Sequence, residues 1–393
     1  MKQALQNLKI LDFSTLLPGP FATMNLGDLG ADILRITTTT RQDLLDVLPP
    51  LLPGENYSAT SAQMNRNKRS LMLNLQEPRA IEIIKKLIME YDIVVEQFRP
   101  GVMKKLGLDY ETLSKINPRL IYCSITGYGH GNSMSRRAGH DINYLSLSGI
   151  PGYSGRNGEP PSLNGIQIAD VAGGSFNAVI GILTAVIHRM NTGEGQFVDI
   201  SMTDGMMAFH AIWGPACLLT GEAPEPEGTL LNGGTIYDYY ETKDGKYISY
   251  GGLEPKFWNS FCKKLGREEW IPLGVNGAGP EIKEEIREII RGKTFDEWME
   301  TMKDADACFE PVLSLREALE SPLAKERNMV VRVSDGNGGS FRQIGSPYKL
   351  SATPPRFDHA GRPVSREETA AILKSFGYSG GEIKEMFRKG VLK

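Results

Sequence analysis

Histidine and aspartate stand side by side in the stretch RRAGHDINYLSLSG, residues 136–149, where a basic pair runs into a helix start. A helix N-terminus disfavours an imidazolium, so His140 is expected to be neutral and able to accept a proton. The backbone N–H groups of the same turn can stabilise an oxyanion. The alternative is structural, because Asp141 is a preferred N-cap residue if the helix begins near Ile142. The stretch therefore allows an acid–base site or a helix cap.

Two further carboxylates precede expected helices. Asp170, in IADVAGG, stands before a long apolar helix at a glycine-rich entry, where small residues let a substrate approach the backbone. Glu254, in GGLEPKFW, stands before Pro255, the usual pattern of a helix start. Taken alone, each of these carboxylates is explained by its helix start.

Basic side chains are concentrated in the first 140 residues. A charge run is usually a solvated face, but in a chain of net charge −3 a cluster on one domain can serve an anionic ligand. The loop GYGHG lacks the GxGxxG spacing, which argues against a nicotinamide cofactor. The basic residues concerned are Arg66, Lys68, Arg69, Arg99, Lys104, Lys105, Arg136 and Arg137.

The N-terminal third alternates short buried strands with helices, which predicts a doubly wound parallel sheet of the α/β class. Two β-rich runs around KDG predict a hairpin in a smaller α+β domain over residues 205–330. Residues 1–204 and 331–393 are expected to form the large domain. The strands expected in the first third include LKILDF, ADILRI, DIVVEQF and RLIYCSITGYG.

Composition indicates a soluble globular protein, with 40% hydrophobic and 23% charged residues. The net charge of −3 argues against a nucleic-acid partner. The apolar stretch Val171–Ile187 falls short of the ~20 residues of a membrane span, so a buried helix and no membrane partner are expected. MKQALQNLKILDF has no secretory pattern, and the four cysteines form no CxxC pair. We therefore expect a cytoplasmic protein without a metal site.

Taken together, the ordered motifs resemble the class III coenzyme A transferase superfamily, which includes formyl-CoA transferase, carnitine CoA-transferase and α-methylacyl-CoA racemase. The resemblance implies a Rossmann-like CoA-binding domain, a smaller domain and an interlocked homodimer. It covers nearly the whole chain. The motifs that carry it are LKILDFSTLLPGPFATMNLGDLGADILRI, NRNKRSLMLNL, VVEQFRPGVMKKLGLDYETL, AGHDINYLSLSG, IADVAGGSFNAVIGILTAVIHRMNTGEGQFVDISM and GGLEPKFW.

Two reactions compete within this resemblance. In a 2-methylacyl-CoA racemase, His140, oriented by Glu254, and Asp170 would move protons on opposite faces of C2, with no metal or redox cofactor and with coenzyme A as part of the substrate. In a CoA-transferase, Asp170 would attack the thioester as a nucleophile. The intact motif GHDINY at 139–144 favours the racemase branch. A catalytically idle CoA-binding protein is a third interpretation, but it would be expected to have lost one of these residues.

The resemblance also implies contacts to the acyl-CoA substrate. It places Asp141 and Tyr144 near the thioester and pantetheine arm, and Arg66, Lys68 and Arg99 near the phosphates or adenine. The chain departs from the pattern after ILRI, where the superfamily usually has an acidic–basic–proline trio and this sequence has TTT at 37–39. The nearest base is Arg41.

Overall fold

The computed structural model describes residues 2–38, 43–336 and 338–393, and the chain folds into two compact units. The larger unit comprises Met1–Ser148, Gly165–Phe209 and Leu323–Lys393, and the smaller one Gly149–Asn164 and His210–Pro322. The sequence predicted a smaller domain over residues 205–330, and the smaller unit spans His210–Pro322 and also includes Gly149–Asn164.

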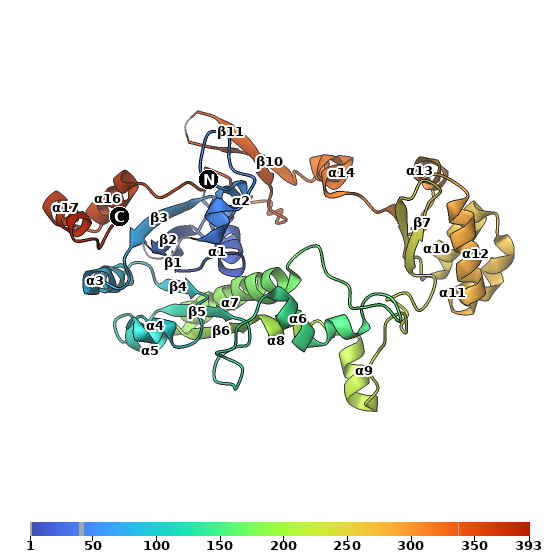
Figure 1. The fold of residues 1–393 in the computed structure, drawn as a ribbon, viewed down its shortest axis with the longest axis horizontal. Coiled ribbons are helices and arrows are strands. Elements are labelled where there is room, and N and C mark those ends of the chain that lie inside the picture. Colours follow the sequence, from blue (N-terminus) through green and yellow to red (C-terminus); the bar gives the residue numbers. More distant parts are fainter. Residues whose placement is uncertain (1, 39–42, 337) are drawn as a thin grey trace. The chain divides into compact units, whose positions relative to one another are not determined.

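A six-stranded sheet forms the centre of the larger unit, with the strand order β3-β2-β1-β4-β5-β6 (Figure 1). Every neighbouring pair is parallel, which confirms the predicted α/β fold. The order reverses between β1 and β4, and doubly wound sheets bind ligands outside the carboxyl ends of their strands at such a switch point. The strands are β1 (Lys9–Asp12), β2 (Asp32–Thr38), β3 (Lys68–Leu73), β4 (Ile93–Glu96), β5 (Ile121–Thr126) and β6 (Phe197–Ser201).

Helices cover both faces of this sheet, because the buried strands present apolar side chains alternately to either side. On one face lie α1 (Pro18–Asp28) and α7 (Asn177–Thr192), and Gly181 of α7 lies against Val198 and Ile200 of β6. The apolar stripe of the amphipathic helix α3 packs into the core of the other face. The helices of that face are α3 (Pro78–Leu87), α4 (Val102–Lys105), α5 (Tyr110–Leu113), α16 (Arg366–Ser375) and α17 (Gly380–Arg388).

The apolar stretch that was predicted to form a buried helix begins as a π-helix, η3 (Ala169–Phe176), and continues directly as α7. Ala169–Thr192 is long and apolar enough to cross a membrane by composition, yet α7 packs on β5 and β6 of the sheet. Arg189 near its end is buried and pairs with Asp92 at 2.9 Å. The segment is thus a core helix of the larger unit with one face exposed.

Helices η3 and α8 (Met202–Met207) approach each other closely through glycine. A Cβ atom at Gly205 would lie 2.7 Å from Cα of Gly173, and one at Gly173 would lie 2.6 Å from the Met202 carbonyl oxygen. Short helices and a hairpin complete the larger unit: η1 (Leu44–Val47), α2 (Ala59–Met64), α6 (Asp141–Ser148), β10 (Val330–Ser334) and β11 (Ser340–Ile344).

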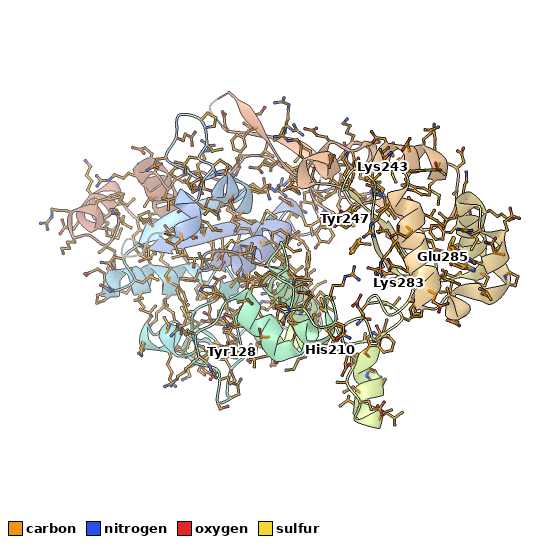
Figure 2. All side chains as sticks on the ribbon, turned by 45° about the vertical axis from the view of Figure 1, so that its right-hand side comes forward. Tyr128, His210, Lys243, Tyr247, Lys283 and Glu285 are labelled. Atoms are coloured by element: carbon orange, nitrogen blue, oxygen red, sulfur yellow. The ribbon has the colours of Figure 1, made fainter. Side chains whose placement is uncertain are left out.

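The smaller unit is built on an antiparallel sheet of β7 (Asp238–Glu241), β8 (Tyr247–Tyr250) and β9 (Phe309–Pro311). The predicted hairpin at KDG is confirmed, since the Thr242 N–H donates to the Lys246 carbonyl at 2.8 Å. Lys283, labelled in Figure 2, pairs with Asp238 at 2.7 Å and ties α12 to β7. The unit's helical elements are η2 (Ile150–Tyr153), α9 (Trp213–Thr220), α10 (Pro255–Leu265), η4 (Glu268–Leu273), α11 (Gly274–Gly277), α12 (Pro280–Arg291), α13 (Phe295–Met302) and α14 (Leu315–Glu320), and α15 (Pro322–Glu326) leads back to the larger unit.

The contact between η3 and α8 predicts the effect of a single methyl group. Gly205→Ala should lower the free energy of unfolding by about 1–3 kcal/mol, because the added Cβ meets backbone that cannot move aside. Urea unfolding followed by circular dichroism measures this loss. Gly380→Ala on α17 is the matched control, since its Cβ meets nothing within 4 Å and should cost no stability. Equal losses in the two variants would contradict the close packing.

Candidate active site

His140 is the residue from which α6 starts. Its carbonyl accepts hydrogen bonds from the Asn143 and Tyr144 N–H groups at 2.8 and 3.3 Å, and its own N–H donates to Asn143 Oδ1 at 3.0 Å. The helix begins at Asp141 rather than near Ile142, and the His140 side chain is exposed. The expectation that Asp141 caps its own helix is therefore wrong, because His140 occupies the capping position.

The Asp141 carboxylate caps the neighbouring helix instead. Its Oδ1 accepts hydrogen bonds from the Ala169 N–H at 2.7 Å and from the Asp170 N–H at 3.0 Å. These are among the first N–H groups of η3, which have no acceptor within their own helix. Asp141 thereby joins the turn that carries His140 to the turn that carries Asp170.

Asp170 is half-buried in the first turn of η3. Burial, followed by the nearby negative charge of Asp141, raises the pKa of its carboxyl group to about 7. Its carbonyl oxygen lies 3.1 Å from Ser175 Oγ, which is also 2.7 Å from the carbonyl oxygen of Pro18 at the start of α1. The Asp170 carboxyl can therefore take up or release a proton near neutral pH, on a backbone tied to the sheet's switch point.

Tyr144 lies on α6, the helix that starts at His140, and packs against the loop before it. Its hydroxyl donates to the Gly139 carbonyl at 2.6 Å, and its ring meets the edge of Tyr128, labelled in Figure 2, at a centroid distance of 5.2 Å. A Cβ at Gly127 would lie 2.2 Å from this ring, so the loop can pass only as glycine. Burial, followed by the charge of Asp170, raises the pKa of Tyr144 to about 12, which keeps the phenol neutral.

Arg99 belongs to the same region, since its positive charge acts on Tyr144 and opposes that rise in its pKa. Its side chain is exposed. The larger unit thus brings the turn of His140 and Asp141 to the turn of Asp170, with Tyr144 on the same helix and Arg99 near enough to act on it, so that five of the eight residues predicted for the site belong to one region.

Arg66 and Lys68 are held elsewhere in the larger unit, in buried ion pairs. Arg66 donates to both Asp28 oxygens at 2.9 and 2.6 Å and to the Ile344 carbonyl at 2.6 Å. Lys68 Nζ lies 3.1 Å from Asp12 and 2.7 Å from Thr23 Oγ1. Their predicted contacts to CoA stay a prediction, and in this conformation both cations are engaged within the protein.

Glu254 lies in the smaller unit. It is exposed at the N-cap position of α10, where its carbonyl accepts hydrogen bonds from the Phe257 and Trp258 N–H groups at 3.0 and 3.1 Å. The helix start expected at Glu-Pro is confirmed. Its predicted partnership with His140 stays a prediction.

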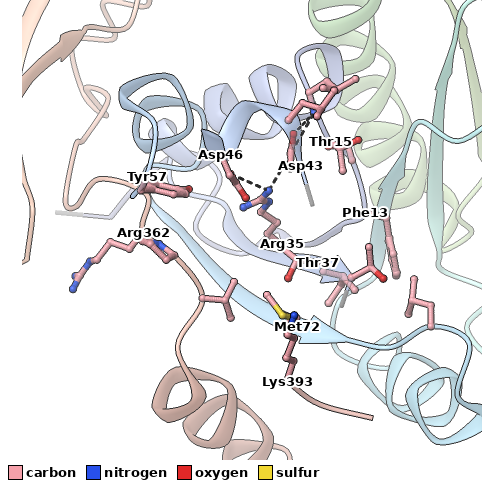
Figure 3. A pocket seen from close by; sticks show the side chains of 18 of the residues that line it. Phe13, Thr15, Arg35, Thr37, Asp43, Asp46, Tyr57, Met72, Arg362 and Lys393 are labelled. Atoms are coloured by element: carbon pink, nitrogen blue, oxygen red, sulfur yellow. Dashed lines mark hydrogen bonds and ion pairs between the residues drawn. The ribbon is translucent and has the colours of Figure 1, made fainter. Parts of the chain in front are cut away.

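A cavity of about 410 Å³ opens at the carboxyl ends of β1, β2 and β3 and beside the end of β4 (Figure 3). Thr37 and Thr38 of the TTT segment line it, whereas Thr39 and Arg41 lie outside the described residues. The sequence analysis did not predict that these residues line a cavity. The available signal was that several of them directly follow the ends of strands. It includes Phe13, Thr15, Arg35, Asp43, Asp46, Tyr57, Met72, Phe98, Arg362 and Lys393.

No group of three or more potential metal ligands was found within residues 2–38, 43–336 and 338–393. The described cluster offers a half-buried carboxyl, an imidazole and the N–H groups of a helix start. A π-helix at this place fits a functional site, where such segments are frequent.

Comparison with known proteins decides the family. CoA-transferase family III matches residues 5–369. The chain belongs to this family. The resemblance seen in the motifs is thereby confirmed.

The relatives of this family III member include enzymes of two kinds. The chain is 35% identical to α-methylacyl-CoA racemase of Homo sapiens, over 98% of this chain and 96% of that protein. It is 30% identical to succinyl-CoA:glutarate CoA-transferase of Mus musculus, over 99% of this chain and 90% of that protein. A CAIB/BAIF family protein from Brucella suis, 27% identical, has the same fold with a TM-score of 0.82, over 96% of this chain and 100% of that one.

The ion pair of Arg66 predicts a structural role for this residue. Arg66→Met should lower the free energy of unfolding by about 3–5 kcal/mol, because it leaves Asp28 buried without its partner. Arg388→Met, which breaks an exposed pair with Glu385, should leave the free energy of unfolding nearly unchanged. Chemical denaturation compares the two variants. Wild-type stability in Arg66→Met would show that the guanidinium does not hold the fold.

The bond between Asp141 and η3 predicts an electrostatic effect. Asp141→Asn keeps an oxygen acceptor for the two N–H groups but removes the charge, so the pKa of Asp170 should fall below its value of about 7. NMR titration of 13C-labelled aspartate carboxyl groups, assigned with Asp170→Asn, measures the shift. Asp199→Asn is the control, because this carboxylate of β6 accepts a hydrogen bond from the His130 N–H at 2.9 Å and does not contribute to the raised pKa of Asp170. It should leave the Asp170 titration unchanged. An unchanged midpoint in Asp141→Asn would refute the coupling.

Proposed function

We propose that this protein racemises 2-methyl-branched acyl-CoA thioesters by 1,1-proton transfer at C2. The observation that carries the proposal is the raised pKa of the Asp170 carboxyl group, which is about 7. This residue lies beside the turn of His140, because its N–H donates to the Asp141 carboxylate. A group that must take a proton in one half-reaction and deliver one in the other works best when its pKa is near the operating pH.

The proton transfers balance within the site. One of the two groups, His140 or Asp170, removes the C2 proton, and the electron pair moves to the thioester oxygen to form an enolate. First-turn N–H groups of α6 can stabilise the enolate oxygen. The other group then delivers a proton to the opposite face of C2, so the product is the epimer. This reaction requires no metal or redox cofactor, and coenzyme A enters only as part of the substrate.

The nucleotide end of the substrate is assigned to the cavity at the carboxyl ends of β1, β2 and β3. Its wall combines aromatic side chains, including Phe13 and Phe98, with the cations Arg35 and Lys393. Such a lining suits an adenine nucleotide. Gln97 links this wall to α1, since it accepts a hydrogen bond from the Gly19 N–H at 3.0 Å and donates one to the Thr15 carbonyl.

Deuterium exchange tests the reaction. A single epimer of a 2-methylacyl-CoA is incubated with the protein in heavy water, and 1H NMR follows the C2 proton and the methyl signal. The expected result is deuterium at C2 together with inversion. In Asp170→Asn only one base remains, so exchange should persist for one epimer without inversion, and His140→Gln should leave exchange of the opposite epimer.

The competing function is a CoA-transferase with Asp170 as the nucleophile, which the identity to two such relatives supports. The matched experiment supplies an unbranched acyl-CoA with a free carboxylic acid and hydroxylamine as a trap. Transfer of CoA to the acid with an Asp170 hydroxamate, and no exchange at C2, would replace the racemase proposal. A racemase gives no trapped aspartyl adduct.

The predicted homodimer, the cytoplasmic location and the role of Glu254 belong to the same proposal. Large apolar side chains are exposed on two helices: on α7, Ile180, Ile187 and Met190 at 61–78%, and on α9, Leu218 and Leu219 at 90% and 87%. A second copy of the chain would cover such apolar surface. Sedimentation velocity measures the oligomeric state. All four cysteines are free, as suits a reducing compartment.

A further inference from the structure

We propose that the side chain of Lys393 binds a phosphate group at the nucleotide end of the substrate, at the rim of the cavity that Thr37 and Thr38 of β2 also line. This inference rests on the proposed acyl-CoA substrate. It assigns a binding role to a residue far from the motifs of the sequence.

The backbone before Lys393 is fixed to the central sheet. Leu392 forms an antiparallel bridge with Leu73 at the end of β3, and the Asn74 N–H donates to the Val391 carbonyl at 2.9 Å. Val391 and Leu392 are 3% and 2% exposed and belong to the core that α17 covers. The packing of these two residues brings the next one, Lys393, to the rim of the cavity.

The other two cations of the cavity wall, Arg35 and Arg362, are less available to a ligand. Arg35 pairs with Asp43 at 3.1 Å and lies 3.7 Å from Asp46, so its charge is offset (Figure 3). The Arg362 side chain points away from the cavity in Figure 3 and packs against Gly336. These two arginines therefore offer little free positive charge to a ligand.

Lys393 differs from both arginines. It is exposed, its side chain points toward Met72 in the cavity, and no described carboxylate forms an ion pair with it (Figure 3). Among the described lining residues it is the cation directed into the cavity whose ammonium group has no side-chain carboxylate as a partner. A phosphate would find its opposite charge there.

Two buried polar atoms on the same wall support a ligand with acceptor and donor groups. Arg35 Nε and Thr37 Oγ1 have no hydrogen-bond partner among the described residues, although the Arg35 side chain is only 3% exposed. A buried polar group without a hydrogen-bond partner lowers the stability of a protein by about 1–3 kcal/mol. Phosphate or ribose oxygens could satisfy both atoms while Lys393 meets the charge.

Binding measurements on the full chain test the proposal. Isothermal titration with coenzyme A and with pantetheine, which lacks phosphate, is carried out at low and high salt on the wild type and variants. Lys393→Met should weaken coenzyme A about 5- to 10-fold and flatten the salt dependence, because one charge-assisted contact is lost. Affinity for pantetheine should not change, and Lys393→Arg should restore coenzyme A binding.

Lys389→Met is the matched control, since this lysine of the same C-terminal segment pairs with Glu385 at 3.2 Å and does not line the cavity. It should bind coenzyme A like the wild type. Wild-type affinity in Lys393→Met, or an equal loss for pantetheine, would overturn the proposal. The proposed racemase reaction fails separately: binding of coenzyme A through Lys393 without exchange at C2 would refute the reaction and leave the phosphate contact standing.

Discussion

The hydrogen bonds from the Ala169 and Asp170 N–H groups to the Asp141 carboxylate organise the candidate site. The N-terminal ends of α6 and η3 converge at this point, and each carries partial positive charge from its helix dipole. A carboxylate between them offsets a repulsion that would otherwise drive the two turns apart. The same negative charge acts on Asp170 and adds to the effect of burial on its pKa. One side chain thus joins the two turns and, after burial, also contributes to the raised pKa of Asp170.

This bond places demands on the rest of the larger unit. For the two turns to meet, the loop before α6 must pass the Tyr144 ring at Gly127 and Gly139, and η3 must approach α8 at Gly173. Side chains at these positions would collide with their neighbours. Ser175 then links η3 to the start of α1, next to the switch point of the sheet. The glycine-rich entry after Asp170 therefore serves the packing of the helix as well as access for a substrate.

Local patterns in the sequence predicted the elements well. The alternation of buried strands and helices predicted the parallel sheet, and the KDG turn predicted the β7–β8 hairpin, because both signals lie within a few neighbouring residues. The partners of the charged side chains could not be predicted in this way. Asp141 binds a turn 28 residues away, and Arg66 pairs with Asp28 across 38 residues. Residue type alone does not tell whether a cation meets a ligand or a buried carboxylate.

The residues that line the cavity show the same limit of prediction from local sequence patterns. Arg35 follows a clear strand pattern, yet only the placement of Asp43 and Asp46 beside it shows that its Nε has no partner within residues 2–38, 43–336 and 338–393. The position of Lys393 depends on a bridge between residues 73 and 392, which no local pattern encodes. Function in this fold therefore depends on contacts between segments that are distant in the sequence.

The choice between the two reactions of this family becomes a question about one carboxyl group. With a pKa of about 7, Asp170 is close to half protonated at neutral pH, which suits a group that must both give and accept a proton. As a nucleophile, and equally as a base, it acts in its ionised fraction, and burial together with the neighbouring charge of Asp141 disfavours that form. An acyl-CoA that brought positive charge close to Asp170 would shift this balance, but the thioester brings none. The electrostatics of the Asp141–Asp170 pair thus set the ionised fraction of the carboxyl group on which either reaction of the family depends.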